Sequence, residues 1–158
     1  MTMRIHHTAP TNPRLSGESG LCYAAGMFDG EGCICITKKS AAKSSGGYHY
    51  RLRVIVSQNH LHTLIDFQSI LGIPGYLYQI RRSISQNRDC FQLIFDGDNA
   101  AALLAILQPY LLRKAPEAAV ALQYQRTCDV NRRVGRAGFP AGVWALRESY
   151  YAKLRRMK

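Results

Sequence analysis

The segment YAAGMFDGEG, residues 23–32, constrains the fold more than any other part of the chain. Cys22, Gly26 and Gly30 lie four residues apart, so in a helix they share one face. All three are small, and such a stripe lets a second backbone approach closely. This effect is best documented between membrane helices, but the steric argument does not require lipid. We therefore predict a helix over about 16–29 that packs beside a partner helix through these three residues.

The same helix is expected to end in a glycine-rich acidic turn. Gly30 and Gly32 flank Glu31, and we expect them to end the helix because glycine tolerates the positive φ values of a helix exit. Glu31 is then left beside exposed backbone, and two such helices side by side would bring two copies of Glu31 close together. Taken alone, the segment is equally compatible with an ordinary helix that ends in an acidic turn.

The charge of the chain indicates a polyanionic partner. The 158 residues carry a net charge of +11, with a pI near 9.8, although a basic surface also serves solubility or binding to an anionic membrane. The length suits one domain with a full core. No apolar run approaches the roughly 18 residues of a membrane span, and the start lacks the apolar core of a signal peptide.

The five cysteines are odd in number and have no Cys-x-x-Cys spacing, so the sequence supports neither a disulfide framework nor a zinc site. Cys22, Cys33 and Cys35 fall in or beside predicted regular elements and fit small buried or interfacial side chains in a reducing compartment, which would be bacterial or phage cytoplasm or an organelle matrix or stroma. The pairs Cys33/Cys35 and His60/His62 are two residues apart, which is common by chance, and we predict no metal site there.

Hydrophobic periodicity and turn residues predict the order α-β-β-α-β-β-α-α-α. The expected helices cover about 16–29, 60–71, 99–112, 116–127 and 143–157, with strands at 32–39, 48–57, 76–82 and 88–95. Ser16 and Asn59 are the expected caps of the first two helices. This order fits an α+β fold with a single four-stranded antiparallel sheet and helices on one face. The order lacks βαβ alternation, which disfavours a doubly wound sheet.

The domain organisation follows from the same pattern. Residues 1–15 show no periodicity and are expected to form a loose arm. Residues 16–158 are expected to form a single domain, with a core over about 16–127 and a C-terminal helical extension over 128–158.

The predicted strands and their hairpin loops are selectively cationic. No Asp or Glu occurs in residues 32–65, which hold five Lys and Arg residues, and residues 76–88 add three arginines without an acid. A sheet face of this kind can enter the major groove and neutralise phosphates, although it also suits the solvated face of a basic protein. We predict that duplex DNA contacts Cys35, Thr37, Lys39, Lys43, His49, Arg51, Arg53, Ile55, Tyr76, Tyr78, Ile80, Arg82 and Arg88.

Residues 24–32, AAGMFDGEG, resemble the signature of the LAGLIDADG homing endonucleases. Ala25, Gly26, Asp29 and Gly32 are identical to it, and most of the other positions keep the size or the charge of the family residue, Ala24 being the exception. The predicted order of elements is also that of the family core, so the resemblance extends over about residues 16–127. The chain holds one copy of the motif, which resembles the homodimeric branch of the family.

The resemblance implies a set of site residues. Glu31 would bind the catalytic divalent metal, with the backbone carbonyl of Gly30 as a further ligand. Gln58 would order the water network, and Lys114, which follows the family-like segment 107–111, would polarise that network. Such hydrolysis needs a carboxylate for Mg²⁺, a positioned water and groups that offset developing charge.

Two further residues have competing interpretations. His62 is either another polar group of the active site or a surface histidine. Asp29 is expected to accept backbone N–H bonds or to contact the partner helix, so the predicted dimer interface comprises Cys22, Gly26, Asp29 and Gly30. The expected cofactor is Mg²⁺. Mn²⁺ would substitute for it, and Ca²⁺ would bind without supporting cleavage.

The sequence therefore predicts a homodimeric, site-specific endonuclease that cuts both strands of a long pseudo-palindromic DNA target. The resemblance implies a gene within an intron and a staggered cut with 3′ overhangs. One alternative is a catalytically silent DNA-binding regulator, or a maturase for intron RNA, on the same fold. Another is a basic ribosome- or RNA-associated domain with an accidental motif.

Overall fold

The computed structural model describes residues 3–5, 16–40, 48–80, 90–131 and 140–158. Its helices are α1 (Gly17–Glu31), α2 (Leu61–Leu71), α3 (Asp98–Leu107), α4 (Ala115–Val130) and α5 (Val143–Arg156), with a 3-10 turn, η1, at Gln108–Tyr110. The strands are β1 (Met3–Ile5), β2 (Gly32–Ser40), β3 (Tyr48–Gln58), β4 (Tyr76–Ile80) and β5 (Cys90–Asp96). The α+β prediction is confirmed.

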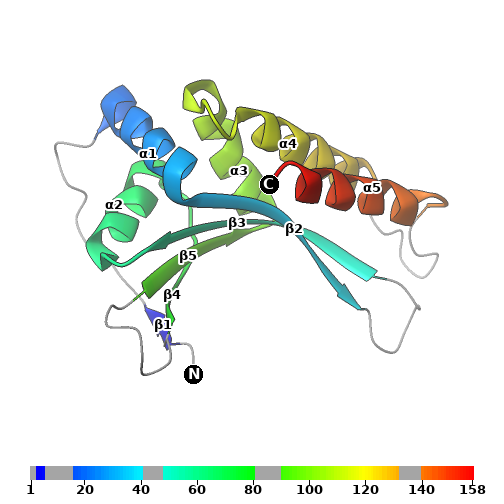
Figure 1. Ribbon diagram of the computed structural model, residues 1–158, viewed down its shortest axis with the longest axis horizontal. Helices are drawn as coiled ribbons and strands as arrows, with labels where there is room; N and C mark the ends of the chain where they lie inside the picture. The colour runs from blue at the N-terminus through cyan, green and yellow to red at the C-terminus, as the bar shows by residue number, and fades with distance from the viewer. Residues whose placement is uncertain (1–2, 6–15, 41–47, 81–89, 132–139) are drawn as a thin grey trace.

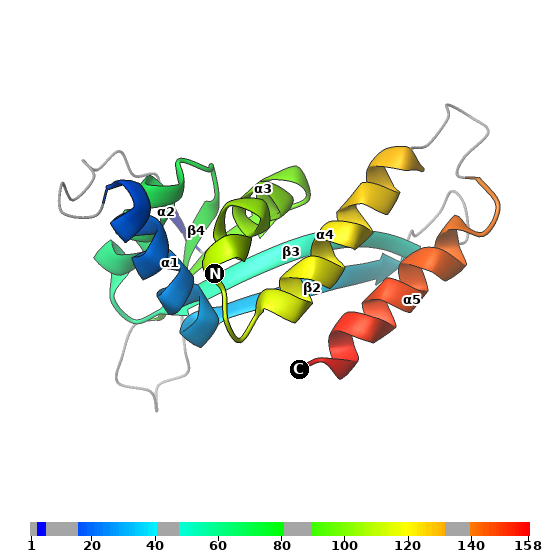
Figure 2. The same cartoon turned by 90° about the horizontal axis from the view of Figure 1, so that it is seen from above.

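The sheet is antiparallel throughout, with the strand order β1-β4-β5-β3-β2. All of the helices lie on one face of the sheet, and the opposite face is left without a helix (Figures 1 and 2). Alternation along the strands explains this arrangement, because successive side chains point to opposite faces. Leu52, Val54 and Val56 of β3 are buried beneath the helices, as are Phe91, Leu93 and Phe95 of β5.

Helix α1 packs on the core through Ala24, Ala25 and Phe28, which are almost fully buried. The ring of Phe28 stacks on that of Phe67 in α2, with 6.5 Å between centroids. The helix ends at Glu31, two residues later than predicted, and the expected reason for the ending glycines is wrong. Gly32 is extended, with a φ of −77°, so a positive φ is not what requires glycine there.

The requirement at Gly32 is steric. A Cβ atom at this position would lie 2.3 Å from Cδ2 of Phe28 and 2.5 Å from its carbonyl oxygen. The chain therefore turns from helix to strand directly against the Phe28 ring, and a side chain would prevent that approach. A left-handed glycine does end α2, where Gly72 has a φ of 64°, as is usual for helix C-termini.

Four other expectations differ from the structure. The sequence predicts a loose arm over 1–15, but Met3–Ile5 pairs with β4 and makes a fifth strand. The helix expected to reach residue 112 ends at Leu107 and continues as η1, since Pro109 has no N–H to donate. Asn59 does not cap α2, because the helix begins one residue later, after His60. Ser16 precedes α1 as predicted, but its side chain makes no cap bond.

The C-terminal helices form a second group over the sheet. Figure 2 shows α4 and α5 side by side, with α5 along β2. The Tyr124 and Tyr150 rings meet edge to face, 6.0 Å apart. In the described ranges, no helix combines the length and apolar character needed to cross a membrane.

Candidate active site and nucleic-acid interface

The end of α1 holds two acidic residues with opposite environments. Asp29 accepts hydrogen bonds from three consecutive backbone N–H groups at the start of α4: Leu112 at 2.7 Å, Arg113 at 3.2 Å and Lys114 at 2.9 Å. Glu31 is exposed, and among the described residues the structure gives it no hydrogen bond or ion pair. The carboxylate of Asp29 is therefore committed to the fold, and that of Glu31 is open to a ligand.

The pKa of Asp29 reflects this commitment. Burial alone would raise it, but the backbone N–H donors of Leu112, Lys114 and Arg113 outweigh burial and hold the pKa of Asp29 below its ordinary value. The carboxylate binds the backbone N–H groups immediately before α4, much as a capping side chain does, although the N-cap residue of α4 is Lys114. The structure thus gives Asp29 the backbone partners that were one of its two expected roles, and its contact with a partner helix stays a prediction.

Lys114 is brought to the motif by the same junction. Its side chain is almost fully buried, with 2% exposure, and its Nζ donates to the backbone carbonyl of Asp29 at 3.0 Å. The Arg113 Nε donates to that carbonyl as well, also at 3.0 Å. Burial, and then the neighbouring guanidinium of Arg113, lowers the pKa of Lys114. Two cations therefore meet the C-terminal end of α1, two residues before Glu31.

Gln58 lies at the same edge of the sheet. Val56 pairs with Gly32 across β3 and β2, so Gln58, two residues further along β3, is next to the junction between α1 and β2. Its Oε1 accepts a hydrogen bond from the backbone N–H of Asn59 at 3.2 Å. The structure therefore brings Glu31, Lys114 and Gln58 to one edge, although the sequence separates them widely.

The position of His62 does not distinguish between its two interpretations. It is exposed in the first turn of α2, with its ring 5.9 Å from that of His60. Its role in the active site stays a prediction.

The metal expected from the sequence would find one carboxylate per chain. Within the described part of the chain, no three His, Cys, Asp or Glu side chains are grouped so that they could hold a metal ion. Magnesium commonly binds through one or two carboxylates and completes its shell with water and substrate phosphate oxygens. The exposed Glu31 fits that pattern, whereas Asp29 does not because its oxygens are already occupied.

The small face of α1 is open in the isolated chain. Cys22, Gly26 and Gly30 are all exposed, and a Cβ atom added at either glycine would meet no described atom within 4 Å. The neighbouring Tyr23 and the 87%-exposed Leu112 add apolar surface at the two ends of this region. Its place in a dimer stays a prediction, but the surface is free to receive a helix.

The helix-free face of the sheet carries the predicted DNA-contact residues that fall in the described ranges. Directly paired residues share a face, and the register pairs Cys35 with Arg53, Thr37 with Arg51, Lys39 with His49, and Ile55 with Ile94. On β4, Tyr76 pairs with Ile94 and Tyr78 with Gln92, and Ile80 lies two residues further along the same face. Lys43, Arg82 and Arg88 lie outside the described residues.

A depression of about 550 Å³ runs across this face and is lined by Arg51, Arg53, Tyr76, Tyr78, Ile80, Gln92, Ile94 and Asp96. Arg53 is bound on both sides of its fork by Asp96, with Nε to Oδ1 at 2.6 Å and a terminal nitrogen to Oδ2 at 2.8 Å. Gln92 donates to the Ser57 hydroxyl at 3.1 Å. The face therefore offers fixed polar groups as well as charge.

Sequence reasoning missed Asp96, Gln92 and Ile94 as members of this face. The signal was present, because Phe91, Leu93 and Phe95 point inward and the residues between them must point outward. The carboxylate of Asp96 makes the face less uniformly basic than the sequence indicates. It also pre-orients the Arg53 fork, which suits recognition of a base edge better than a loose phosphate contact.

Two cysteines complete the edge near Glu31. The Cys33 Sγ lies 3.0 Å from the Lys158 Nζ. The Cys35 thiol, together with Lys158, lowers the pKa of Cys33 to about 5, whereas hydrogen bonding to Cys33 and burial raise the pKa of Cys35. Lys158 thus brings the last described residue of the chain beside the start of β2.

Comparison with known proteins identifies this architecture. The family model described as LAGLIDADG endonuclease matches residues 24–130. The fold is similar to the crystal structure of the homing endonuclease I-CvuI in complex with its target in the presence of calcium, with a TM-score of 0.70, 22% identity, and coverage of 88% of this chain and 82% of that one.

A second solved relative is the archaeal intron-encoded homing endonuclease I-Vdi141I complexed with DNA. Its TM-score is 0.69 at 13% identity, with 88% of this chain and 84% of that chain covered. Comparison with curated protein sequences gave no match.

Proposed function

The chain belongs to the LAGLIDADG endonuclease family, and we propose that it is a homodimeric, site-specific endonuclease that hydrolyses both strands of a DNA target with a divalent metal. The observation that carries this proposal is the pairing of an open carboxylate with a buried cation at one edge of the sheet. Glu31 has no partner among the described residues, while Lys114 is held 3.0 Å from the Asp29 carbonyl. A binding protein would not require that combination.

The groups of this chain divide the chemistry between them. Glu31 would hold Mg²⁺ together with the carbonyl of Gly30. When bound, the metal would supply Lewis-acid stabilisation and lower the pKa of a water molecule. The Lys114 ammonium, which is held by its bond to the Asp29 carbonyl, would polarise the water network and offset charge that develops on the phosphate oxygens. The Gln58 amide would orient the attacking water.

The substrate would lie on the helix-free face of the sheet. The similar structures are I-CvuI in complex with its target and I-Vdi141I complexed with DNA, and the helix-free face of this chain carries Arg51, Arg53 and Lys39. Contacts of this kind would neutralise phosphates and read base edges, so affinity should fall steeply with salt.

Dimerisation would follow from the open face of α1. With Cys22, Gly26 and Gly30 in contact across a two-fold axis, two copies of Glu31 would face opposite strands of one duplex. The two sheets would then continue in opposite directions along the DNA, so the target would be long and pseudo-palindromic. The free cysteines fit a reducing compartment.

The experiment is a cleavage selection. Wild-type protein and Glu31→Gln are incubated with a library of long randomised DNA inserts, first with Mg²⁺ and then with Ca²⁺, and new ends are sequenced. We expect ends with a common stagger around a pseudo-palindrome for wild type with Mg²⁺ alone. Glu18→Gln, which removes a carboxylate from the first turn of α1, is the matched control and should cut like wild type.

Two outcomes would overturn the proposal. If neither wild type nor Glu31→Gln yields ends, but both retain one family of DNA sequences, the protein is a DNA-binding regulator. If both prefer structured intron RNA to duplex DNA, the maturase function replaces the endonuclease.

A further inference from the structure

Helix α5 lies along β2 and runs in the opposite direction. Near the far end of β2, Glu148 of α5 contacts Lys38, and near its beginning Lys158 contacts Cys33. From Glu148 to Arg156, where α5 ends, the helix rises about 12 Å, and the strand from Cys33 to Lys38 spans about 16 Å. Helix α5 and the two residues that follow it therefore reach β2 close to both of its ends.

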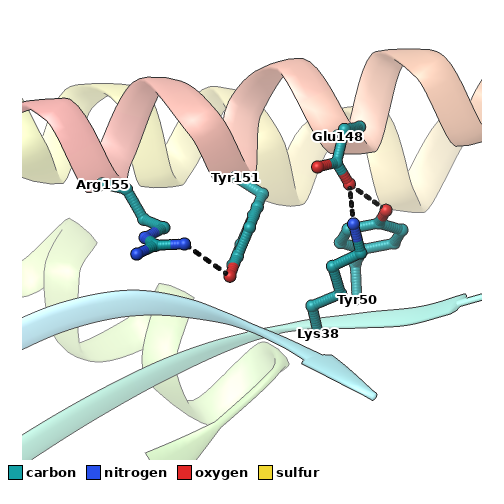
Figure 3. Close-up of polar contacts among 5 residues, drawn as sticks. All are labelled: Lys38, Tyr50, Glu148, Tyr151 and Arg155. Carbon is teal, nitrogen blue, oxygen red and sulfur yellow. Dashed lines mark hydrogen bonds and ion pairs between the residues drawn. The ribbon is translucent and has the colours of Figure 1, made fainter. Parts of the chain in front are cut away.

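The contact at the far end joins three elements through one carboxylate. Figure 3 shows Glu148 reaching down from α5 to Lys38 of β2 and Tyr50 of β3. The Lys38 Nζ donates to Glu148 Oε2 at 2.7 Å, and the Tyr50 hydroxyl donates to the same oxygen. Lys38 and Tyr50 are directly paired across the two strands. A single oxygen of α5 thus holds both strands of the hairpin at the same register position.

Aromatic rings support this contact from the helix side. The Tyr50 ring lies 6.4 Å from that of Trp144 and 6.1 Å from that of Tyr151, both on α5. The Lys38 Nζ lies 4.3 Å from the centroid of the Tyr48 ring. Arg155 donates to the Tyr151 hydroxyl at 3.4 Å (Figure 3). The far end of the hairpin is therefore held by α5, through the Glu148 carboxylate and through the Tyr50 and Tyr151 rings, which pack against the margin of the hydrophobic core.

The residues on either side of the Lys38–Tyr50 pair point to the opposite face. Thr37 pairs with Arg51 and Lys39 pairs with His49, and these side chains line a hollow of about 320 Å³ on the proposed DNA face. The Thr37 hydroxyl donates to the Arg51 carbonyl at 3.2 Å. Neighbouring residues of a strand point to opposite faces of the same backbone. Fixing Lys38 and Tyr50 therefore also fixes the side chains beside them that line the hollow.

We propose that Glu148 is a positioning residue for sequence recognition, which sets the β2–β3 hairpin so that Lys39, His49 and Arg51 reach the outer base pairs of each half-site. The inference rests on the proposed function, since it requires a DNA target. Base-edge readout depends on side chains held within a fraction of an ångström. The side chains of Lys38 and Glu148 are 25% and 44% exposed, so their bond adds little to global stability, which leaves orientation as its effect.

The test compares Glu148→Gln and Glu148→Ala with wild type on target libraries that vary one base pair at a time. Glutamine keeps an acceptor oxygen without the charge, and alanine removes it. We expect discrimination at the outer positions to fall about threefold for Gln and about tenfold for Ala, while central positions keep their wild-type preference. On the best target, KM should rise and kcat should stay unchanged. Ser149→Ala, on an exposed neighbour in α5, is the control.

A measurement without DNA separates this inference from the proposed function. Amide hydrogen exchange of Glu148→Ala should be faster at residues 38–40 and 48–50, and unchanged at 52–56 in the core of β3. Faster exchange there with an unchanged specificity profile would overturn the inference and leave the endonuclease intact. A uniform loss of discrimination together with a lower unfolding midpoint would show that Glu148 serves only stability. Wild type that cuts no DNA would instead contradict the proposed function.

Discussion

The two ends of β2 are held by different kinds of contact. At its start, the carboxylate of Asp29 takes three backbone N–H groups of the α4 junction. At its far end, the carboxylate of Glu148 takes two side-chain donors, Lys38 and Tyr50. Backbone donors have no rotamers to lose, so the first contact fixes geometry with the core. The second depends on long, partly exposed side chains and is easier to alter without unfolding the protein.

The largest expected effect is at the start of β2. Gly32→Ala places a Cβ atom 2.3 Å from the Phe28 ring and 2.5 Å from its carbonyl, which should lower the free energy of unfolding by about 2 to 3 kcal/mol. Urea denaturation measures this change in the free energy of unfolding. Gly26→Ala adds the same methyl group where no described atom lies within 4 Å, so it should spare the fold of the monomer and weaken the dimer. Equal losses for both variants would contradict the steric explanation.

The next effect concerns the backbone contacts themselves. Asp29→Ala removes the acceptor of three N–H groups, and we expect a loss of about 2 kcal/mol, at the upper end of values for helix caps. Asp29→Asn keeps an acceptor oxygen and should lose about half of that. Chemical denaturation of the two variants gives the ratio. A stable Asp29→Ala protein would show that the α4 junction does not depend on this carboxylate.

A smaller effect should appear in acid. The pKa of Asp29 is held below its ordinary value of 3.8, so its stabilising contribution is complete above about pH 4 and is lost as the pH falls through the folded-state pKa. Asp96, paired with Arg53, has a lowered pKa as well and acts in the same direction. The thermal unfolding midpoint should therefore fall less steeply between pH 5 and pH 2 for Asp29→Asn than for wild type. If the midpoints of both proteins fell equally steeply with pH, Asp29 would not contribute to the loss of stability in acid.

The smallest effect on stability is expected at the far end of β2. Glu148→Ala should leave the thermal unfolding midpoint unchanged, since the Lys38–Glu148 pair is exposed and screened. A calorimetric scan of this variant beside Asp29→Ala tests the comparison directly. If Glu148→Ala lost as much stability as Asp29→Ala, the two ends of β2 would be held in the same way.

The sequence predicted the sheet well because alternation is a local signal. The inward positions of β3 and β5, such as Leu52 and Phe95, follow from the alternation of inward and outward side chains alone. The same alternation places Asp96 and Gln92 on the outward face, but neither was among the predicted DNA-contact residues. The strand β1 was missed because three residues are too few to show a period, and its pairing with β4 is set by an edge that only the folded sheet presents.

The grouping of residues around Glu31 could not be predicted from local sequence patterns alone. Family resemblance singled out Glu31, Gln58 and Lys114, but no local rule links residue 29 to residue 114. Their contact arises from how η1 and α4 follow α3. The Glu148 contact is similarly invisible to the sequence, since it joins β2 and β3 to a helix more than ninety residues later.

The contact between Asp29 and the residues before α4 also constrains the order in which this chain can fold. The carboxylate meets N–H groups 83 to 85 residues further on, and closing so long a loop costs entropy before any contact is gained. A growing chain that has not yet exposed residue 114 carries its motif helix without the junction that completes it. The contact between the end of α1 and Lys114 can therefore form only after both segments have been synthesised, and a chain that stops before residue 112 lacks every donor to the Asp29 carboxylate.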